Sequence, residues 1–167
     1  GPLFHAPWPI ARTRRVSTTE VHSMEFGIER LNLDDSSTDA LALKEARAEL
    51  KKVREEAEML TGEGWIVSIA YAIQYRIHDA RTWTYEHSAP QETIRRLAQE
   101  SIRRIAAKRT TEDILVGNSM GFRQATEAEL AKLLASAGLG VELIGVELQS
   151  VHAPPAVHSA YRNVASA

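Results

Sequence analysis

The most regular pattern of the chain is an alternation of apolar and polar residues that ends at Ile77. Bulky side chains occupy every second position of this stretch: Val67, Ile69, Tyr71, Ile73, Tyr75 and Ile77. Because successive side chains of a strand point to opposite faces, the spacing predicts a long strand with one buried face. A turn over residues 59–64 is expected to precede this strand, and residues 78–80 are expected to end it.

A second alternating stretch begins at Val141 and slips by one position near Gly145. A glycine at such a slip predicts a β-bulge, because it absorbs the extra residue without a side-chain clash. Gly138 is expected to take a positive φ at the end of the preceding helix. The strand should end at residues 151–153. Pro154 and Pro155 then suit the first turn of a helix that runs from Ala156 to Ala167.

Apolar stripes predict three helices between these two strands. The first begins near Ser88, where Gln91 completes a capping box and Pro90 stands near the first helical position. A short helix capped by Thr110 follows, and then a longer one that ends at residue 137. One or two strands are expected over residues 16–28, and residues 81–87 read as a connection. This order predicts an α+β fold with a small, mainly antiparallel sheet covered by helices on one side.

A further helix is predicted from about Thr38 to Glu58. Its small or apolar residues are spaced alternately by three and four: Leu43, Ala46, Leu50, Val53, Ala57 and Leu60. That narrow stripe is typical of a coiled-coil seam, whereas a helix lying on a globular core usually shows a wider one. Two interpretations stay open: the helix packs on its own domain, or it docks against a neighbouring copy or a partner.

The composition mainly excludes certain partners, covalent links and sites. The 167 residues are 44% apolar and 25% charged, as in a folded domain with an ordinary core. A net charge of −2 argues against nucleic acid as a partner. The absence of cysteine excludes disulfides and thiolate metal sites, and no apolar run reaches the length of a membrane span. The chain stops inside a predicted helix, so we expect it to belong to a longer protein.

Basic residues are open to two interpretations. Arg12, Arg14 and Arg15 form either a solvated strand edge or a contact with lipid headgroups. Arg103 and Arg104 lie off the apolar stripe of their helix, with other basic residues. They form either a solvated face or a site for acidic groups of a neighbour.

The string from Gly117 to Gly121 has the form of a nucleophile elbow with Ser119 as nucleophile, and His152 and His158 lie downstream. The residues before it, however, indicate a helix start and not a strand. The histidines do not have the spacing of a metal site, and no glycine-rich phosphate loop is present. Residue chemistry alone therefore favours a binding or assembly module, without metal, cofactor or small-molecule substrate.

Separated motifs across nearly the whole chain resemble the HflK branch of the stomatin–prohibitin–flotillin–HflK/C (SPFH, or Band 7) family. They are His5 to Ile10 (His-Ala-Pro-Trp-Pro-Ile), Val21 to Gly27, Met59 to Gly62 with Ile66 and Val67, Ile73 to Ile77 (Ile-Gln-Tyr-Arg-Ile), Arg109 to Leu115, Gly138 to Pro155, and Val157 to Ala167. The chain departs from the family pattern at Glu63-Gly64-Trp65, in its shorter proline run, and in the added helix near residues 38–58.

The resemblance implies an SPFH domain over residues 1–155 with an inserted helical segment at 32–61, and the start of a C-terminal coiled-coil helix at 156–167. It implies a non-enzymatic membrane scaffold that is anchored upstream of Gly1 and assembles into a ring or cage. The partners would be an HflC-like subunit and a membrane-bound AAA protease of the FtsH type. The expected location is the bacterial inner membrane, with the domain on the periplasmic side.

The contact residues expected for such an assembly are Leu43, Leu50, Val53, Ala57, Arg103, Arg104, Pro154, Pro155 and Tyr161. Two other functions stay open. One is a stomatin-like homo-oligomeric scaffold that organises other membrane proteins, and the more remote one is a serine hydrolase that uses Ser119.

Overall fold

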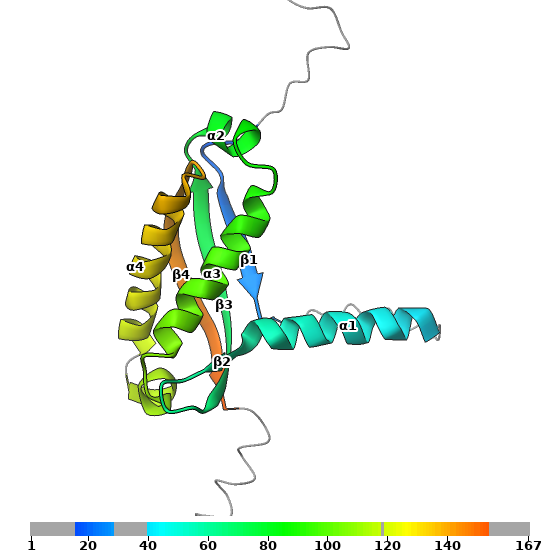
Figure 1. The fold of residues 1–167 in the computed structure, drawn as a ribbon, viewed down its shortest axis with the longest axis vertical. Helices are drawn as coiled ribbons and strands as arrows, with labels where there is room; N and C mark the ends of the chain where they lie inside the picture. The colour runs from blue at the N-terminus through cyan, green and yellow to red at the C-terminus, as the bar shows by residue number, and fades with distance from the viewer. Residues whose placement is uncertain (1–15, 29–39, 118, 154–167) are drawn as a thin grey trace, which may run out of the picture.

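A four-stranded antiparallel sheet forms the centre of the molecule (Figure 1). The computed structural model describes residues 16–28, 40–117 and 119–153, with only the backbone described at 40–43 and 116–117. The strands are β1 (Val21–Phe26), β2 (Glu58–Leu60), β3 (Ile66–Ile77) and β4 (Val141–His152). β1 and β2 pair with different stretches of one edge of β3, and β4 pairs with the other edge.

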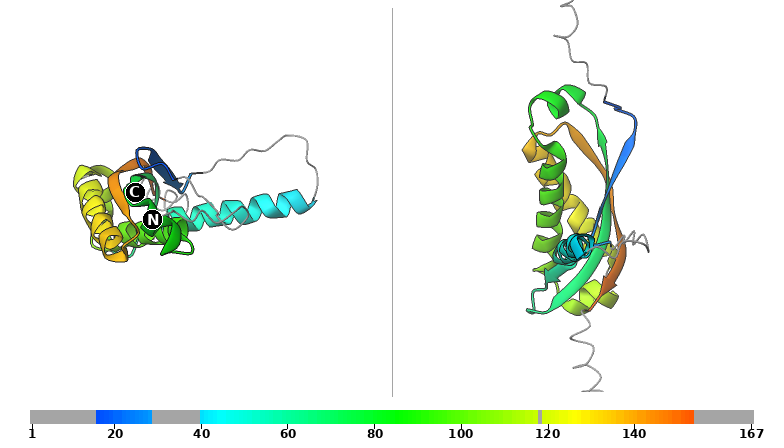
Figure 2. Two further views of the ribbon diagram at one scale, coloured as in Figure 1. Left: turned by 90° about the horizontal axis from the view of Figure 1, so that it is seen from above. Right: turned by 90° about the vertical axis from the view of Figure 1, so that its right-hand side faces the viewer.

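The helices are α1 (Ala40–Ala57), α2 (Ala80–Tyr85), α3 (Pro90–Ala106), the π-helix η1 (Asp113–Gly117) and α4 (Ser119–Ala137). α3 and α4 lie side by side over one face of the sheet, and α1 projects away from the body (Figure 2). The predicted α+β fold, with helices covering one side of a small antiparallel sheet, is confirmed. None of the helices in the described ranges is both long and apolar enough to cross a membrane.

The core lies between β3 and the two covering helices. All six bulky residues of the predicted β3 face are buried, and Ile69, Tyr71 and Ile73 have no exposed surface. Ile94 and Ile102 of α3 and Leu130 of α4 are buried against the same cluster. Each such side chain contributes about 1.5–3 kcal/mol on burial, so the alternation in β3 fixes which face the helices cover.

β4 contains two irregularities in its pairing with β3. Gln74 pairs with Gly145 but Tyr75 pairs with Leu143, so Ile144 is an extra residue, and the bulge predicted near Gly145 is confirmed. The second shift leaves Gln149 without a partner position between Leu148 and Ser150. No glycine marks this second site, which is why the sequence pattern did not predict it.

Glycines end α4 as predicted. The helix stops at Ala137, Gly138 has a φ of +62°, and Gly140 has a φ of +67°. A Cβ on Gly140 would lie 2.8 Å from the carbonyl oxygen of Asp79. The turn into β4 therefore requires glycine at position 140 for two reasons: its φ is positive, and there is no room for a Cβ.

Three local predictions were wrong. α3 begins at Pro90 as expected, but its N-cap is Ala89 and no side chain caps it, so Ser88 does not form the capping box. Residues 80–85 form helix α2, because the Asp79 carboxylate accepts hydrogen bonds from the backbone N–H groups of Arg81 and Thr82. Residues 58–60 form strand β2, so the turn that was predicted to begin at residue 59 is confined to residues 61–65.

Two other predictions held with shorter bounds or a different helix type. The expected strand over residues 16–28 is β1, at Val21–Phe26. The short helix after Thr110 is present, and its cap is confirmed, since the Asp113 N–H donates to Thr110 Oγ1 at 3.1 Å. Its C-terminal part is the π-helix η1. The predicted helix at 156–167 and the basic run at 12–15 lie outside the described residues.

Candidate assembly surface

Helix α1 leaves the body at its C-terminal end and extends beyond the sheet edge formed by β1 and β2 (Figures 1 and 2). Of the α1 side chains that the structure describes, residues 44–57, Ala57 at the base is buried at 4% exposure, whereas Lys51, Lys52 and Arg54 are exposed. The helix therefore extends outward over most of its length.

Arginines of α3 hold the base of α1. Arg95 Nη1 donates to both carboxylate oxygens of Glu56, at 3.1 and 3.2 Å, and its guanidinium lies 4.8 Å from the centre of the Phe26 ring. Arg103 Nη2 donates to the carbonyl oxygen of Glu55 at 2.7 Å. That carbonyl belongs to the last turn of α1, where cations also interact favourably with the helix dipole. These contacts fix the direction in which α1 projects.

The seam of α1 has one apolar stripe between two flanks of opposite charge. Ala46, Leu50 and Val53 are half-buried, and Ala57 at the base is buried. At 100° per residue, Arg47 and Arg54 fall on one side of this stripe, and Glu49 and Glu56 on the other. Such a helix can bury its stripe against an apolar surface whose two rims carry complementary charges.

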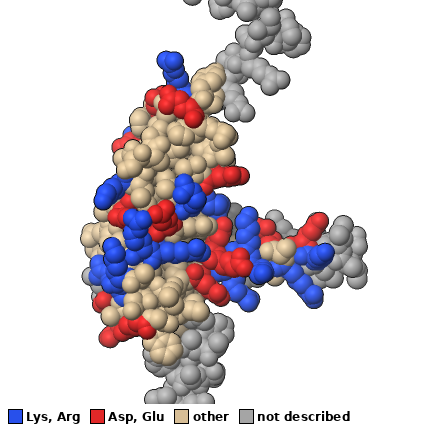
Figure 3. Space-filling model, in the orientation of Figure 1, with Lys and Arg blue, Asp and Glu red and all other residues tan. Residues whose placement is uncertain are grey.

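The structure does not gather all of the other predicted assembly contacts beside α1. Arg103 reaches α1, but Arg104 pairs with Glu129 of α4 and with Glu100 of its own helix α3, each at 2.5 Å. Figure 3 shows the resulting band of basic side chains across α3, interrupted by acidic ones. The Leu43 side chain and residues Pro154, Pro155 and Tyr161 lie outside the described part of the chain.

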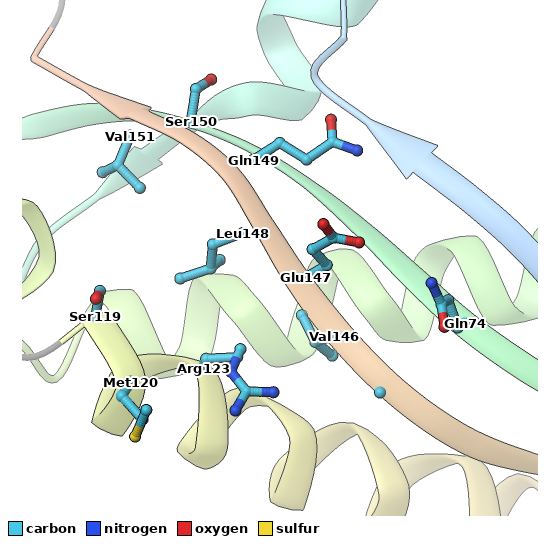
Figure 4. A pocket seen from close by; sticks show the side chains of 11 residues that line it. Gln74, Ser119, Met120, Arg123, Val146, Glu147, Leu148, Gln149, Ser150 and Val151 are labelled. Carbon is cyan, nitrogen blue, oxygen red and sulfur yellow. The ribbon is translucent and has the colours of Figure 1, made fainter.

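Sequence reasoning missed a groove along β4, which we call the β4 groove. Its volume is about 600 Å³. Figure 4 shows Met120 and Arg123 of α4 on one side of β4, and Glu147 and Gln149 on the other. Its lining residues are Gln74, Ser119, Met120, Arg123, Gly145, Val146, Glu147, Leu148, Gln149, Ser150 and Val151. The one available signal was Met120, an apolar residue outside the buried stripe of its helix, which is 63% exposed.

A carboxylate on α4 supports the inner side of this groove. Glu127 Oε1 accepts hydrogen bonds from the backbone N–H of Val146 at 3.0 Å and from Arg123 Nη1 at 2.7 Å. Among the described strands β4 pairs only with β3, so Glu127 satisfies a backbone donor of an edge strand next to the bulge at Ile144. The bond to the Val146 N–H ties α4 to β4 beside the groove.

Ser119 lines the β4 groove but lacks the setting of a catalytic nucleophile. It is the first residue of α4, and the described residues before it form the π-helix η1. An elbow requires a strand in that place, so that the serine stands on a sharp strand-to-helix turn. Within the described ranges, no group of three or more histidine or acidic residues is placed to hold a metal ion.

Among the described residues, the Tyr71 phenol has the most strongly shifted pKa. Burial raises its pKa far above the ordinary value of 10.0, and Glu56 adds to the effect, while Arg103 and Arg95 oppose it. Its ring stacks on Phe26 with centres 4.5 Å apart, and its hydroxyl has no hydrogen-bond partner among the described residues. A buried neutral phenol beside the base of α1 fits a packing role and not proton transfer.

The matched family model is the SPFH domain / Band 7 family, over residues 1–167. "Protein HflK" of Treponema pallidum is 28% identical over 152 residues, which are 90% of this chain and 43% of that protein. "Modulator of FtsH protease HflK" of Escherichia coli is 26% identical over 109 residues, 65% of this chain and 26% of that protein. The chain thus spans less than half the length of these curated relatives.

Proposed function

The chain belongs to the SPFH domain / Band 7 family, and from that membership we propose that it is a non-enzymatic scaffold subunit of a membrane-anchored multimer. The multimer is a ring or cage that modulates a membrane-bound AAA protease of the FtsH type. The observation that carries this proposal is the similarity to the Escherichia coli protein whose name is "Modulator of FtsH protease HflK". Its mechanism is steric: the assembly limits which substrates reach the protease.

The proposed arrangement follows the family. Residues 1–155 form the SPFH domain, α1 belongs to a segment inserted at 32–61, and residues 156–167 begin a coiled-coil helix. An anchor upstream of Gly1 places the domain on the periplasmic side of a bacterial inner membrane. A homologous HflC-like subunit and the protease are the expected partners.

The geometry of α1 supports assembly through this helix. A seam that projects beyond the body offers its apolar stripe to a second molecule, whereas a helix serving only its own core would lie along the sheet. We assign contact roles to Leu43, Leu50 and Val53, with Ala57 and Arg103 holding the base. Pro154 and Pro155 are proposed to set the direction of the following helix, and Arg104 and Tyr161 are proposed as further partner contacts.

Purification of the full-length protein in mild detergent tests the proposal. We expect a large multimer that co-purifies with an FtsH-type protease and a second family member. A multimer of this chain alone, without a protease, would favour the stomatin-like alternative, and a monomer by sedimentation would refute both scaffolds. Fluorophosphonate labelling that is lost in Ser119→Ala would instead support the hydrolase.

A further inference from the structure

The projecting helix and the β4 groove lie at opposite edges of the sheet. α1 leaves the body beside β1 and β2, which pair with one edge of β3, and the groove lies along β4, which pairs with the other (Figure 1). One molecule therefore carries a protruding element on one side and a hollow on the other. Two copies placed side by side bring these two features together.

The two features also lie at the same height along β3. A Cβ on Gly27, which touches Ala57 at the base of α1, would lie 3.1 Å from the carbonyl oxygen of Ile69. Ile69 pairs with Val151 and Tyr71 with Leu148, and both of these β4 residues line the groove. The base of α1 and the groove therefore lie at the same level of the sheet. Because α1 runs across the strand direction (Figure 1), the neighbour that receives it along β4 is turned relative to the first copy.

Their surfaces are complementary in chemistry. The groove offers Met120, Leu148 and Val151 as apolar contacts, with Arg123 on the α4 side and Glu147 on the other side (Figure 4). The α1 seam offers Leu50 between a glutamate flank and an arginine flank. Docked along β4, the helix faces Arg123 with its Glu49 flank and Glu147 with its Arg47 flank. It also covers an edge strand, which is one way in which proteins protect unpaired strand edges.

Pairing of α1 with α1 of another copy fits less well. In an antiparallel pair each flank meets the same flank of its partner, so arginine faces arginine and glutamate faces glutamate. A parallel pair would place the second body where the first already packs against Ala57, because that end of the seam is buried. The partner surface of α1 is therefore one that differs from α1 itself.

We propose that α1 of one copy docks in the β4 groove of the next copy, head to tail. The inference rests on the proposed assembly and names the surface that this assembly uses. A contact between two different surfaces repeats from copy to copy, and it closes into a ring when the rotation allows. The helix, 18 residues long, spans about 27 Å at 1.5 Å per residue, which is enough to lie along a neighbour.

Disulfide mapping in the full-length protein tests the contact. The chain has no cysteine of its own, so Leu50→Cys and Met120→Cys introduce the only thiols of this domain. The double variant should give a ladder of cross-linked species under mild oxidation, and a mixture of the two single variants should give dimers. Leu50→Cys alone should give no more cross-linked species than the unmodified protein gives. Cross-linking of Leu50→Cys alone would overturn the inference in favour of α1–α1 pairing.

Charge exchange provides a second test that does not disturb the core. Arg47 and Glu147 are both exposed, so reversal of either leaves the fold intact. Arg47→Glu and Glu147→Arg should each weaken assembly at least tenfold, and the double variant should restore it. Met120→Asp should weaken assembly as well, whereas Tyr85→Asp, at an apolar residue that is 73% exposed on α2, should not.

The outcomes separate the two proposals. If the multimer and its protease persist while none of the groove variants changes assembly, the docking inference fails and the proposed function stands. If the unmodified full-length protein is a monomer, the proposed function fails first. If Arg47→Glu combined with Glu147→Arg restores assembly, both the docking inference and the proposed function are supported.

Discussion

Gly27 lies directly against Ala57, so closely that a Cβ on the glycine would come within 2.8 Å of the alanine Cβ. Gly27 follows β1 and has a φ of +68°, and Ala57 is the last residue of α1. This contact joins the end of the first strand to the base of the projecting helix. Two small residues are required here because the backbone of one meets the side chain of the other.

Gly27→Ala should destabilise the domain by more than the cost of placing an alanine at a left-handed φ. A left-handed φ costs a residue with a Cβ about 1–2 kcal/mol, and the collision with Ala57 adds to that cost. Gly64→Ala is the matched control, because Gly64 has a φ of +83° with open space around its Cβ position. Urea unfolding of the two variants should show the larger loss for Gly27→Ala, and equal losses would contradict the close contact.

Arg95→Ala should loosen the base of α1. The variant loses the ion pair with Glu56 and the contact over Phe26, and since the Arg95 side chain is 39% exposed we expect a cost of only about 1 kcal/mol. Faster amide hydrogen exchange in the last two turns of α1 would report this loss. Arg96→Ala is the control, because Arg96 is 69% exposed and lies 4.0 Å from Glu100. Unchanged exchange in Arg95→Ala would show that the ion pair does not hold the helix.

Tyr71→Phe should keep or raise stability at neutral pH and improve resistance to alkali. The buried hydroxyl lacks a partner among the described residues, so its removal should gain about 1 kcal/mol. Burial raises the pKa of Tyr71 in the folded state above the unfolded value near 10. The contribution of the neutral phenol to the free energy of unfolding is therefore fully present below pH 10, and it is lost as the pH rises toward the folded-state pKa. The loss in that window approaches about 1.4 kcal/mol per pH unit for each such group.

Unfolding curves between pH 9 and 12 would test the effect of Tyr71. The exposed Tyr85 supplies the control, since Tyr85→Phe should follow the unmodified protein. Tyr75 has a pKa raised by burial too, so some alkaline loss should remain in Tyr71→Phe. Identical alkaline transitions with and without Tyr71 would show that its ionisation does not drive unfolding.

Glu127→Ala should destabilise the junction of α4 and β4. The Val146 N–H and the Arg123 guanidinium both lose their acceptor, and we expect a cost of about 1–3 kcal/mol. Glu127→Gln keeps an acceptor oxygen and should recover part of the loss. Thermal unfolding of both variants would measure the difference, and equal stabilities would mean that water replaces the carboxylate at no cost.

Leu50→Asp should weaken assembly of the full-length protein while the domain stays folded. Leu50 lies in the half-buried stripe of α1, beyond the buried base, so the core does not depend on it. Ala48→Asp is the matched control on the same helix, at an exposed position off the stripe. Sedimentation would report the assembly and circular dichroism the fold. General unfolding of Leu50→Asp would instead indicate a helix packed on its own domain.

Local patterns fixed much of the fold in advance. The alternation in β3, the glycines at the end of α4 and the bulge at Ile144 each depend on residues close in the chain, where backbone geometry and side-chain period decide the outcome. α2 was missed because its cap, Asp79, stands in a stretch without apolar periodicity. The second bulge was missed for a similar reason, since no permissive residue marks it.

The sequence by itself determined the family motifs, the sheet with one helical face, and the seam of α1, because each is a matter of residue type and spacing. Only the tertiary structure decided the direction of α1 and the existence of the β4 groove. Arg95 and Glu56 lie 39 residues apart, and Glu127 and Val146 lie 19 apart, on different elements. Such pairs depend on how helices pack across the sheet, and no local period of the chain encodes that arrangement.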